Sequence, residues 1–241
     1  MRIIGVLPSR YASTRFPGKP LKLIKGKSLI RRVWERAKQS KFLDEVIVAT
    51  DDSRIAKEVK KFGGKCVMTS RACKCGTDRL AEVVRKSERN ADIVINIQGD
   101  EPLIPPILID ALAAELVRDK QLNVATAIYP LIRKNDIVNP NIAKVIVDKK
   151  GFAVYFSRSV VPYNRDGGKT AYFKHIGIYA YRKSFLLNYA KWPQTPLEKA
   201  EQLEQLRILE NGFKIKTVVS ISDSMGVDVP SDIKKIERLI A

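Results

Sequence analysis

The sequence predicts an α/β fold: a doubly wound, mostly parallel, Rossmann-like sheet that carries a smaller mixed α+β insertion. Apolar strand patterns alternate with helical patterns through the first half of the chain, which is typical of βαβ units. The strands are continuous runs of Val and Ile, as expected where helices cover both faces of a sheet. With 241 residues, of which 45% are hydrophobic, the chain is long enough to bury a large core as one domain over residues 1–241.

The first half contains the regular alternation. An apolar stripe of Leu29, Ile30 and Val33 marks its first helix, and Gly63 with Gly64 ends its second. The expected order is strand 2–6, helix 27–40, strand 45–49, helix 53–62, strand 65–68, helix 77–86, strand 93–97 and a helix ending near residue 119.

The second half is less regular and contains the predicted insertion. Thr195, Pro196 and Glu198 form a helix start with a cap, a proline at the first position and a capping box. The expected order is strand 123–129, a hairpin of 144–148 with 152–156, strand 172–181, helix 195–210, strand 214–220 and a helix from 231.

Composition excludes several classes of protein. There is no apolar run long enough to span a bilayer and no signal-peptide pattern, so we expect a cytoplasmic protein without a membrane partner. Three cysteines and one histidine lack the paired spacing of a zinc site. The net charge of +18 is spread over short Lys and Arg pairs without a basic tract, so we expect no nucleic-acid partner, although a basic nucleic-acid-binding protein remains the alternative from another class.

The segment Leu7–Pro20 (LPSRYASTRFPGKP) follows the first strand and has the composition of a phosphate-binding loop. Small residues, among them Ser13 and Gly18, allow backbone amides to approach a ligand. Three cations share the loop: Arg10, Arg15 and Lys19. Neither common glycine-rich phosphate motif is present. A basic surface loop is the alternative interpretation.

Carboxylates follow other predicted strands. Asp100 and Glu101 end the strand 93–97, and Asp228 stands between Gly226 and a helix that begins with Pro230. Ligands bind at the carboxyl ends of parallel strands, and Mg²⁺ is typically held by one or two carboxylates together with substrate phosphates. Asp100 and Asp228 are therefore candidate magnesium ligands, with helix capping as the alternative for Asp228.

Eight segments together resemble the 3-deoxy-manno-octulosonate (Kdo) cytidylyltransferase family over nearly the whole chain. The resemblance implies a nucleotidyltransferase fold with an insertion and dimerisation subdomain. The segments are PSRYASTRFPGKP, ATD, GTDRLAEV, NIQGDEP, YFSRS, KHIGIYAY, LEQLR and GVDVPSD, in that order.

The resemblance implies a set of site residues. Asp100 and Asp228 would bind Mg²⁺ and act in catalysis with Lys19 and Arg15. The other expected roles follow. Arg10, Ser13, Arg15, Lys19, Thr50, Gly76, Arg79 and Gln98 would bind the nucleotide, and Gln98, Arg158, His175, Tyr179, Glu204 and Gln205 would bind the sugar acid. Structural roles for His175, Arg158 and Tyr179, and a solvated helix face for Glu204 and Gln205, are the alternatives.

The implied reaction transfers CMP from CTP to the anomeric hydroxyl of Kdo, giving CMP-Kdo and pyrophosphate for lipopolysaccharide biosynthesis. The 8-amino form of the sugar is an alternative acceptor. Residues 1–120 would bind the nucleotide, 121–220 would bind the sugar and form a homodimer through 144–156, and 221–241 would return to the active site. The alternative for the apolar strands of 144–156 is that they complete the core. Ser9, Cys75 and Val229 depart from the family pattern, and Cys75 adjoins the loop expected to meet the cytosine.

Overall fold

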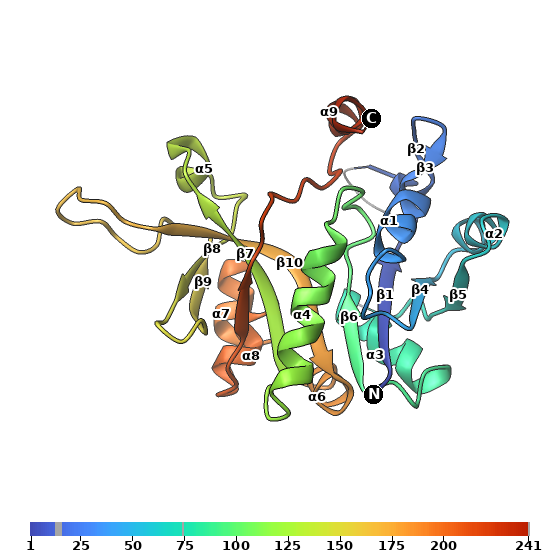
Figure 1. The fold of residues 1–241 in the computed structure, drawn as a ribbon, viewed down its shortest axis with the longest axis horizontal. Helices are drawn as coiled ribbons and strands as arrows, with labels where there is room; N and C mark the ends of the chain where they lie inside the picture. The colour runs from blue at the N-terminus through green and yellow to red at the C-terminus, as the bar shows by residue number, and fades with distance from the viewer. Residues whose placement is uncertain (13–15, 74, 241) are drawn as a thin grey trace.

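A nine-stranded sheet forms the centre of the computed structural model, which describes residues 1–12, 16–73 and 75–240 (Figure 1). The strands are β1 (Ile3–Ser9), β2 (Leu23–Ile24), β3 (Lys27–Ser28), β4 (Glu45–Thr50), β5 (Lys65–Met68), β6 (Ile93–Asn96), β7 (Val124–Leu131), β8 (Lys144–Val147), β9 (Ala153–Ser157), β10 (Tyr172–Arg182) and β11 (Lys216–Val219). The helices are η1 (Lys19–Leu21), α1 (Leu29–Ala37), α2 (Ser53–Lys61), α3 (Gly76–Lys86), α4 (Pro106–Arg118), α5 (Lys134–Val138), α6 (Lys183–Tyr189), α7 (Pro196–Glu201), α8 (Leu206–Glu210) and α9 (Pro230–Leu239).

The sheet confirms the predicted α/β class. Its main strands lie in the order β11, β7, β10, β6, β1, β4, β5, and β8 and β9 extend from β10. β1 is parallel to β4 and β6, β4 is parallel to β5, and β7 is parallel to β11. β10 runs antiparallel to β6, β7 and β8, and β2 and β3 form a separate small hairpin. The predicted hairpin of 144–148 with 152–156 is present as β8 and β9.

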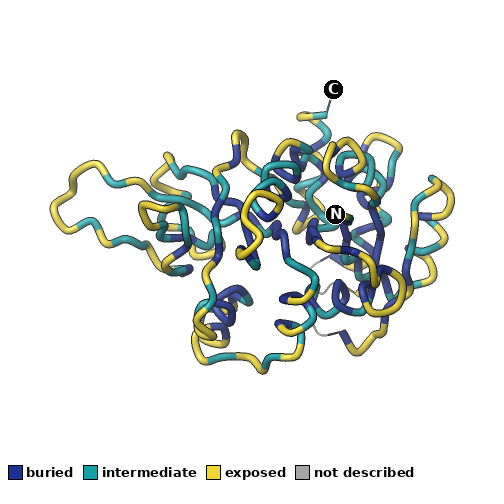
Figure 2. Tube along the Cα trace, turned by 60° about the horizontal axis from the view of Figure 1, so that its bottom comes forward, coloured by how far each residue is buried: buried dark blue, intermediate teal, exposed yellow. Residues whose placement is uncertain are grey.

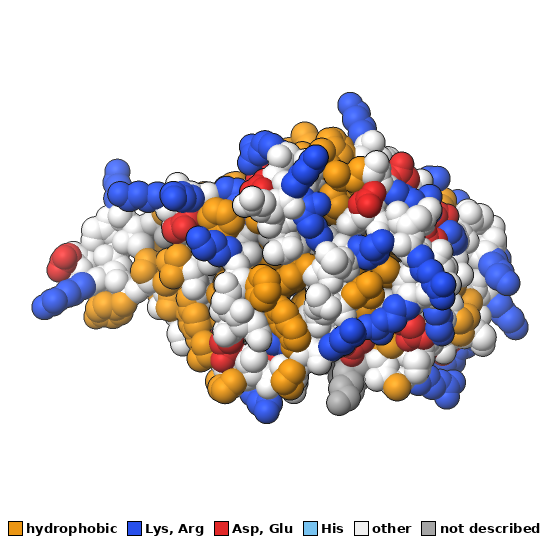
Figure 3. Space-filling view, turned by 90° about the horizontal axis from the view of Figure 1, so that it is seen from below, with side chains coloured by type: hydrophobic (Ala, Val, Ile, Leu, Met, Phe, Trp, Pro, Cys, Tyr) orange, Lys and Arg blue, Asp and Glu red, His pale blue; other side chains and the backbone are white. Residues whose placement is uncertain are grey.

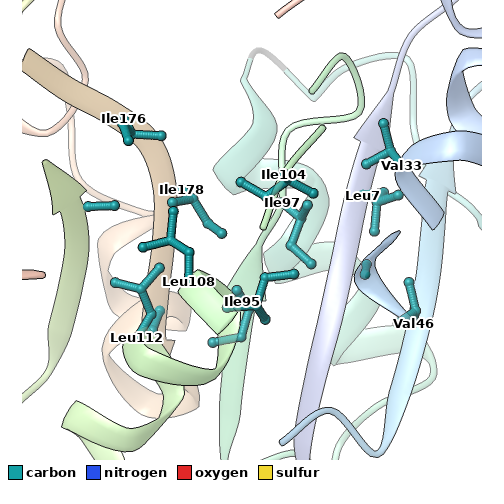
Figure 4. Close-up of a cluster of buried hydrophobic side chains, with 14 of the residues drawn as sticks. Leu7, Val33, Val46, Ile95, Ile97, Ile104, Leu108, Leu112, Ile176 and Ile178 are labelled. Atoms are coloured by element: carbon teal, nitrogen blue, oxygen red, sulfur yellow. The ribbon is translucent and has the colours of Figure 1, made fainter. Parts of the chain in front are cut away.

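Helices cover both faces of this sheet, which explains the continuous apolar strands. Along β1, Ile3 and Leu7 join the core cluster under α1, α2 and α4, whereas Ile4 and Val6 join the cluster under α3, α6 and α8. Figure 4 shows part of the first cluster, where Leu108 and Leu112 of α4 meet strand residues such as Ile95. Leu112 is fully buried, so truncating it to Ala would destabilise the fold by about 2 to 5 kcal/mol.

The strand order reverses between β1 and β6. The chain proceeds from β1 outward through β4 and β5, and then returns to the other side of β1 with β6. Such a switch point opens a crevice outside the carboxyl ends of the two strands, where ligands bind in open α/β sheets. The segment 97–102 follows β6, and the phosphate-loop segment follows β1, so both candidate segments lie at this switch point.

The predicted continuous helix 195–210 is wrong. Gln202 adopts a left-handed conformation with φ 53° and separates α7 from α8. The sequence after it explains the break, because Leu203 and the four residues 205–208 are all buried. One straight helix cannot place four consecutive side chains on the same face, and the break reorients α8 against the sheet. The helices α5 and α6 and the β2–β3 hairpin were not among the expected elements.

The connection from β9 to β10 projects away from the rest of the molecule (Figure 1), and most of its residues are exposed in Figure 2. None of the helices in the described part of the chain is long and apolar enough to cross a lipid bilayer. On the face shown in Figure 3, Lys and Arg side chains are spread among acidic and hydrophobic ones. That distribution does not favour the nucleic-acid-binding alternative.

Candidate functional site

The ends of β1 and β6 approach each other closely at Gly99. A Cβ atom at this position would lie 2.7 Å from Ser9 Oγ and 3.0 Å from the Pro8 carbonyl oxygen. A side chain would therefore force the two strand ends apart. Gly99 thus allows the segment that carries Gln98 and Asp100 to lie against the start of the phosphate-loop segment.

Lys19, Asp100 and Asp228 come together at this crevice. The Lys19 ammonium donates a hydrogen bond to Asp100 Oδ2 at 2.6 Å and lies 3.9 Å from Asp228 Oδ1. The Lys19 side chain is 14% exposed, whereas those of Asp100 and Asp228 are 31% and 56% exposed. The Lys19 ammonium is therefore mostly buried, whereas the two carboxylates are partly exposed to solvent. The carboxylates lie close together although they are 128 residues apart in the sequence.

The segment before α9 is fixed to the loop after β6. Val227 N donates to the carbonyl oxygen of Asp100 at 2.9 Å, and Ser224 Oγ donates to Glu101 Oε2 at 2.5 Å. Burial raises the pKa of Glu101 to about 7, because an ionised carboxylate loses its hydration there. These contacts place Asp228 beside Asp100, as the sequence predicted.

The pair of carboxylates fits a magnesium ion. Mg²⁺ prefers hard oxygen ligands and commonly takes one or two carboxylates, with water and substrate phosphates completing the coordination. Within the described residues, no group of three or more His, Cys, Asp or Glu side chains could hold a metal. With Asp100 and Asp228 as its protein ligands, such an ion would need water and substrate phosphates to complete its coordination.

An arginine-rich cavity of about 450 Å³ lies on the β4 side of the crevice. Arg79 is 1% exposed and donates to Thr69 Oγ1 at 2.5 Å and to Asp51 Oδ2 at 2.9 Å. Arg10 donates to the carbonyl oxygen of Cys73, and Arg54 stacks on the Tyr11 ring with 3.3 Å between guanidinium carbon and ring centroid. The cavity is lined by Arg10, Tyr11, Ala12, Asp51, Asp52, Arg54, Arg71 and Arg79. Guanidinium groups and an aromatic face suit a nucleotide.

A second, smaller cavity of about 150 Å³ lies on the β10 side of the crevice. It brings together predicted residues from four separate parts of the chain and adds others that sequence reasoning missed. The predicted lining residues are Gly76, Gln98, Tyr179, Glu204 and Gln205, and the missed ones are Thr77, Asn96, Tyr181 and Tyr189. This lining offers amides, phenols and a carboxylate, which suit a polyhydroxylated ligand.

Glu204 connects the small cavity to a neighbouring one of about 510 Å³, which it lines together with Cys75. The Cys75 thiol donates to Glu204 Oε1 at 3.4 Å. Burial, and then the charge of Glu204, raise the pKa of Cys75 to about 12, so the thiol stays protonated and remains a donor. Cys75 therefore contacts the predicted sugar side of the crevice.

Other predicted residues lie outside both linings. Thr50 Oγ1 accepts a hydrogen bond from Asp52 N at 3.2 Å and so serves the turn before α2. The Arg158 guanidinium donates to the carbonyl oxygens of Glu201 at 2.8 Å and Pro140 at 3.0 Å. Ser13 and Arg15 lie outside the described residues.

His175 lies behind the small cavity. Its ring centroid is 5.1 Å from that of Phe156 and 5.4 Å from that of Tyr179, and Nε2 is 3.0 Å from Thr126 Oγ1. Burial lowers the pKa of His175 to about 3, so the imidazole is neutral. It contacts Tyr179 of the lining but does not itself line the cavity.

Sequence patterns gave little signal for the missed residues. Thr77, Asn96 and Tyr181 stand inside the segments that carry the family resemblance, but the runs around Asn96 and Tyr181 predict buried strands. Tyr189, and Arg71 of the larger cavity, lie outside those segments. Only the sheet register, which pairs Asn96 of β6 with Tyr179 of β10, places Asn96 at the cavity.

A basic cavity, a carboxylate pair and a polar pocket surround one switch point. This arrangement defines an α/β protein built to join a nucleotide to a second, hydroxylated ligand. Comparison with known proteins agrees. A family model described as cytidylyltransferase matches residues 4–217.

Full-length relatives are closer still. The 3-deoxy-manno-octulosonate cytidylyltransferase of Fusobacterium nucleatum is 49% identical over 240 residues, covering 100% of this chain and 97% of that protein. The enzyme of the same name from Geobacter metallireducens is 47% identical, covering 98% and 96%. A solved structure of CMP:2-keto-3-deoxy-manno-octonic acid synthetase complexed with CTP is 44% identical, has a TM-score of 0.95 and covers 100% of this chain and 98% of that one. The chain belongs to the 3-deoxy-manno-octulosonate cytidylyltransferase family.

Proposed function

We propose that this protein transfers CMP from CTP to the anomeric hydroxyl of Kdo, releasing CMP-Kdo and pyrophosphate for lipopolysaccharide biosynthesis. The observation that carries the proposal is the meeting of Lys19, Asp100 and Asp228 between a basic cavity and a small polar one. The relatives named above support the choice of CTP as donor and Kdo as acceptor.

The donor half of the reaction uses the cations at the end of β1. Arg10 and Lys19 would bind the triphosphate, and we extend this role to Ser13 and Arg15 from the resemblance. Arg10 and Arg79 line the cavity proposed for the nucleotide, and Thr50 lies just before it at the end of β4. Fixed cations stabilise the negative charge that develops on the departing pyrophosphate.

The acceptor half uses the small cavity. Gln98, Tyr179, Glu204 and Gln205 would bind hydroxyl groups of the sugar acid. Gly76, which the resemblance assigns to the nucleotide, also lines this cavity and would leave room where the two ligands meet. Arg158 and His175 belong to our proposal through the resemblance, since a guanidinium suits the carboxylate and His175 supports the Tyr179 ring. The hydroxyl oxygen loses its proton to water and forms a bond to the α-phosphorus, while the bond from phosphorus to the bridging oxygen breaks and pyrophosphate leaves.

Asp100 and Asp228 would hold Mg²⁺, which supplies charge neutralisation at the phosphates and orients the reacting oxygens. The protein's own contribution is mainly positioning, which can supply about 7 to 11 kcal/mol of the barrier when the attack geometry is held. Lys19 adds a fixed positive charge beside the two carboxylates.

The larger organisation is part of the proposal. Residues 1–120 would bind the nucleotide, 121–220 would bind the sugar and form a homodimer through 144–156, and 221–241 would supply Asp228. We place the reaction in the cytoplasm, where CTP is available.

A pyrophosphate-release assay tests the proposal. With CTP, Mg²⁺ and Kdo, we expect turnover that falls to background when the sugar or the metal is omitted, and that is much weaker with ATP, GTP or UTP. The 8-amino sugar, assayed in parallel, decides between the two acceptors. The absence of turnover with CTP and either sugar would contradict the proposal.

A further inference from the structure

The small cavity contains a buried polar atom that the roles proposed so far do not use. Asn96, the last residue of β6, is 4% exposed, and its side-chain oxygen Oδ1 has no hydrogen-bond partner among the described residues. Leaving a buried carbonyl oxygen unpaired is unfavourable, and such atoms in native proteins mark places where another group completes the bonding.

Asn96 lies at a cavity that separates its strand from other polar residues. Asn96 lines the 150 Å³ cavity and pairs across the sheet with Tyr179, one of the proposed sugar-binding residues. It lies on the central strand between β1 and β10, so the main chain around it is held by neighbours on both sides. A carboxamide fixed in this way is a preorganised acceptor.

The cavity also contains a complementary buried donor. Gln205 is 3% exposed, and its Nε2 has no hydrogen-bond partner within the part of the chain that the structure describes. Two other polar groups of the lining are already engaged: Gln98 Nε2 donates to the Gly177 carbonyl oxygen at 2.7 Å, and the Tyr189 hydroxyl donates to the Glu204 carbonyl oxygen at 2.9 Å. One unused acceptor and one unused donor suit hydroxyl groups, which both donate and accept.

We propose that Asn96 is a specificity-determining residue for the acceptor, and that its Oδ1 accepts a hydrogen bond from one hydroxyl group of the sugar acid. This inference rests on the proposed function. A neutral amide suits the role, because an aspartate here would add a third negative charge to the ligand carboxylate and Glu204. A sugar that lacks the hydroxyl would leave the Asn96 oxygen buried and unpaired, and would be bound more weakly.

The test combines Asn96 variants with a series of monodeoxy analogues of Kdo. In Asn96→Ala and Asn96→Leu we expect the KM for Kdo to rise about tenfold, as for the loss of one buried hydrogen bond, while the KM for CTP stays within twofold. For one analogue of the series, the KM of the variants should not exceed that of the wild-type protein, since the contact is missing in both and the variants bury no unpaired oxygen.

Thr217→Val is the matched control. Thr217 is a strand residue with 8% exposure whose hydroxyl donates to the Gly151 carbonyl oxygen at 2.9 Å, outside the cavity. This variant loses a hydrogen bond and some stability, but it should leave the KM for Kdo unchanged. Thermal unfolding of all variants identifies any that fail to fold, and Asn96→Asp, which keeps the acceptor and the size, provides a second variant; it should bind Kdo more weakly as the ligand carboxylate is repelled.

The outcomes separate this proposal from the proposed function. If the wild-type protein shows no turnover of Kdo with CTP, both the proposed function and the role of Asn96 are contradicted. If the wild-type protein turns over Kdo but the folded Asn96 variants keep the wild-type KM, or lose the same factor for every deoxy analogue, the function stands and the Asn96 contact is overturned.

Discussion

At the scale of one residue, Lys19 contacts two carboxylates that come from distant parts of the chain. We therefore expect its replacement to reduce activity. Lys19→Met keeps the length of the side chain but removes the charge 2.6 Å from Asp100. We expect kcat/KM for the nucleotidyl transfer to fall by about 100-fold or more, as when one group that stabilises transition-state charge is removed. Steady-state kinetics with CTP and Kdo measure it.

Lys22→Met is the control for Lys19, since Lys22 is exposed three residues further along and contacts the Phe16 ring. It should keep kcat/KM within twofold. Equal losses in the two variants would show that the overall charge of the segment matters and not the contact with the carboxylates.

His175 gives a prediction for pH. Its pKa is about 3 in the folded protein and about 6.5 when unfolded, so between these values the unfolded chain binds the extra proton. The neutral His175 imidazole therefore makes its full contribution to the free energy of unfolding above pH 6.5, and this contribution is lost as the pH falls. Glu101, whose pKa is raised, contributes with the opposite sign between about pH 4.5 and 7, so the comparison must be made with a variant.

We expect the difference in unfolding free energy between the wild-type protein and His175→Gln to fall by up to about 1.4 kcal/mol per pH unit below pH 6.5. The contribution of Glu101 cancels in that difference. Urea unfolding at several pH values measures it, and parallel pH profiles for the two proteins would show that the ring is not buried as described.

At the scale of elements, an ion-pair network joins four parts of the sheet layer at the edge opposite the crevice. Arg2 and Lys65 both contact Glu45 and Glu88, with nitrogen to oxygen distances between 2.6 and 2.9 Å. The network ties the starts of β1, β4 and β5 to the end of α3. The Glu88 side chain is 2% exposed, and burial alone would raise its pKa. The hydrogen bonds from Lys65 and Arg2 outweigh this effect and lower the pKa.

Glu88→Gln should therefore lower the unfolding free energy by about 2 kcal/mol and leave turnover unchanged, since it weakens charged hydrogen bonds far from the site. Chemical denaturation and the pyrophosphate assay measure the two effects. The exposed pair of Lys61 with Glu58, 3.7 Å apart, offers the control, because Glu58→Gln should change stability by less than about 0.5 kcal/mol. Loss of turnover in Glu88→Gln would contradict the separation of this edge from the site.

Local patterns predicted most elements of the fold, because helix periodicity and apolar strand runs depend on residues that are close together in the sequence. They failed where tertiary contacts override them. After Pro196 at the helix start, the region up to residue 210 contains no Gly or Pro to mark the break at Gln202. The break allows both Leu203 and Leu206 to be buried.

The site was predictable to a similar extent and for a similar reason. Asp100, Asp228 and Lys19 stand in short segments with a chemical signature, and the structure brings them together as expected. Asn96 stands in the same segment as Asp100, NIQGDEP, but it was not singled out, because the apolar run that it ends predicts a buried strand and its role depends on the strand that pairs with it.

At the scale of the whole molecule, exposed apolar side chains near the projecting connection favour the proposed homodimer. Val154 of β9 is 56% exposed, and Tyr163 in the projection is 85% exposed. We expect light scattering to give about twice the chain mass of 27.2 kDa, and Val154→Glu to reduce it to one chain.

Val219→Glu is the matched control, because Val219 of β11 is also 56% exposed and lies outside residues 144–156. It should leave the mass unchanged. A wild-type protein with the mass of one chain would remove the homodimer from the proposal without affecting the site.

The central claim is that the two cavities bind a donor and an acceptor that react at the carboxylate pair between them. Mass spectrometry of the products tests it most directly, using purified protein with CTP, Mg²⁺ and Kdo. We expect one CMP-Kdo conjugate for each pyrophosphate released, and neither product with Asp100→Asn or Asp228→Asn. Pyrophosphate release without a nucleotide-sugar conjugate, or undiminished conjugate formation by both variants, would contradict the account.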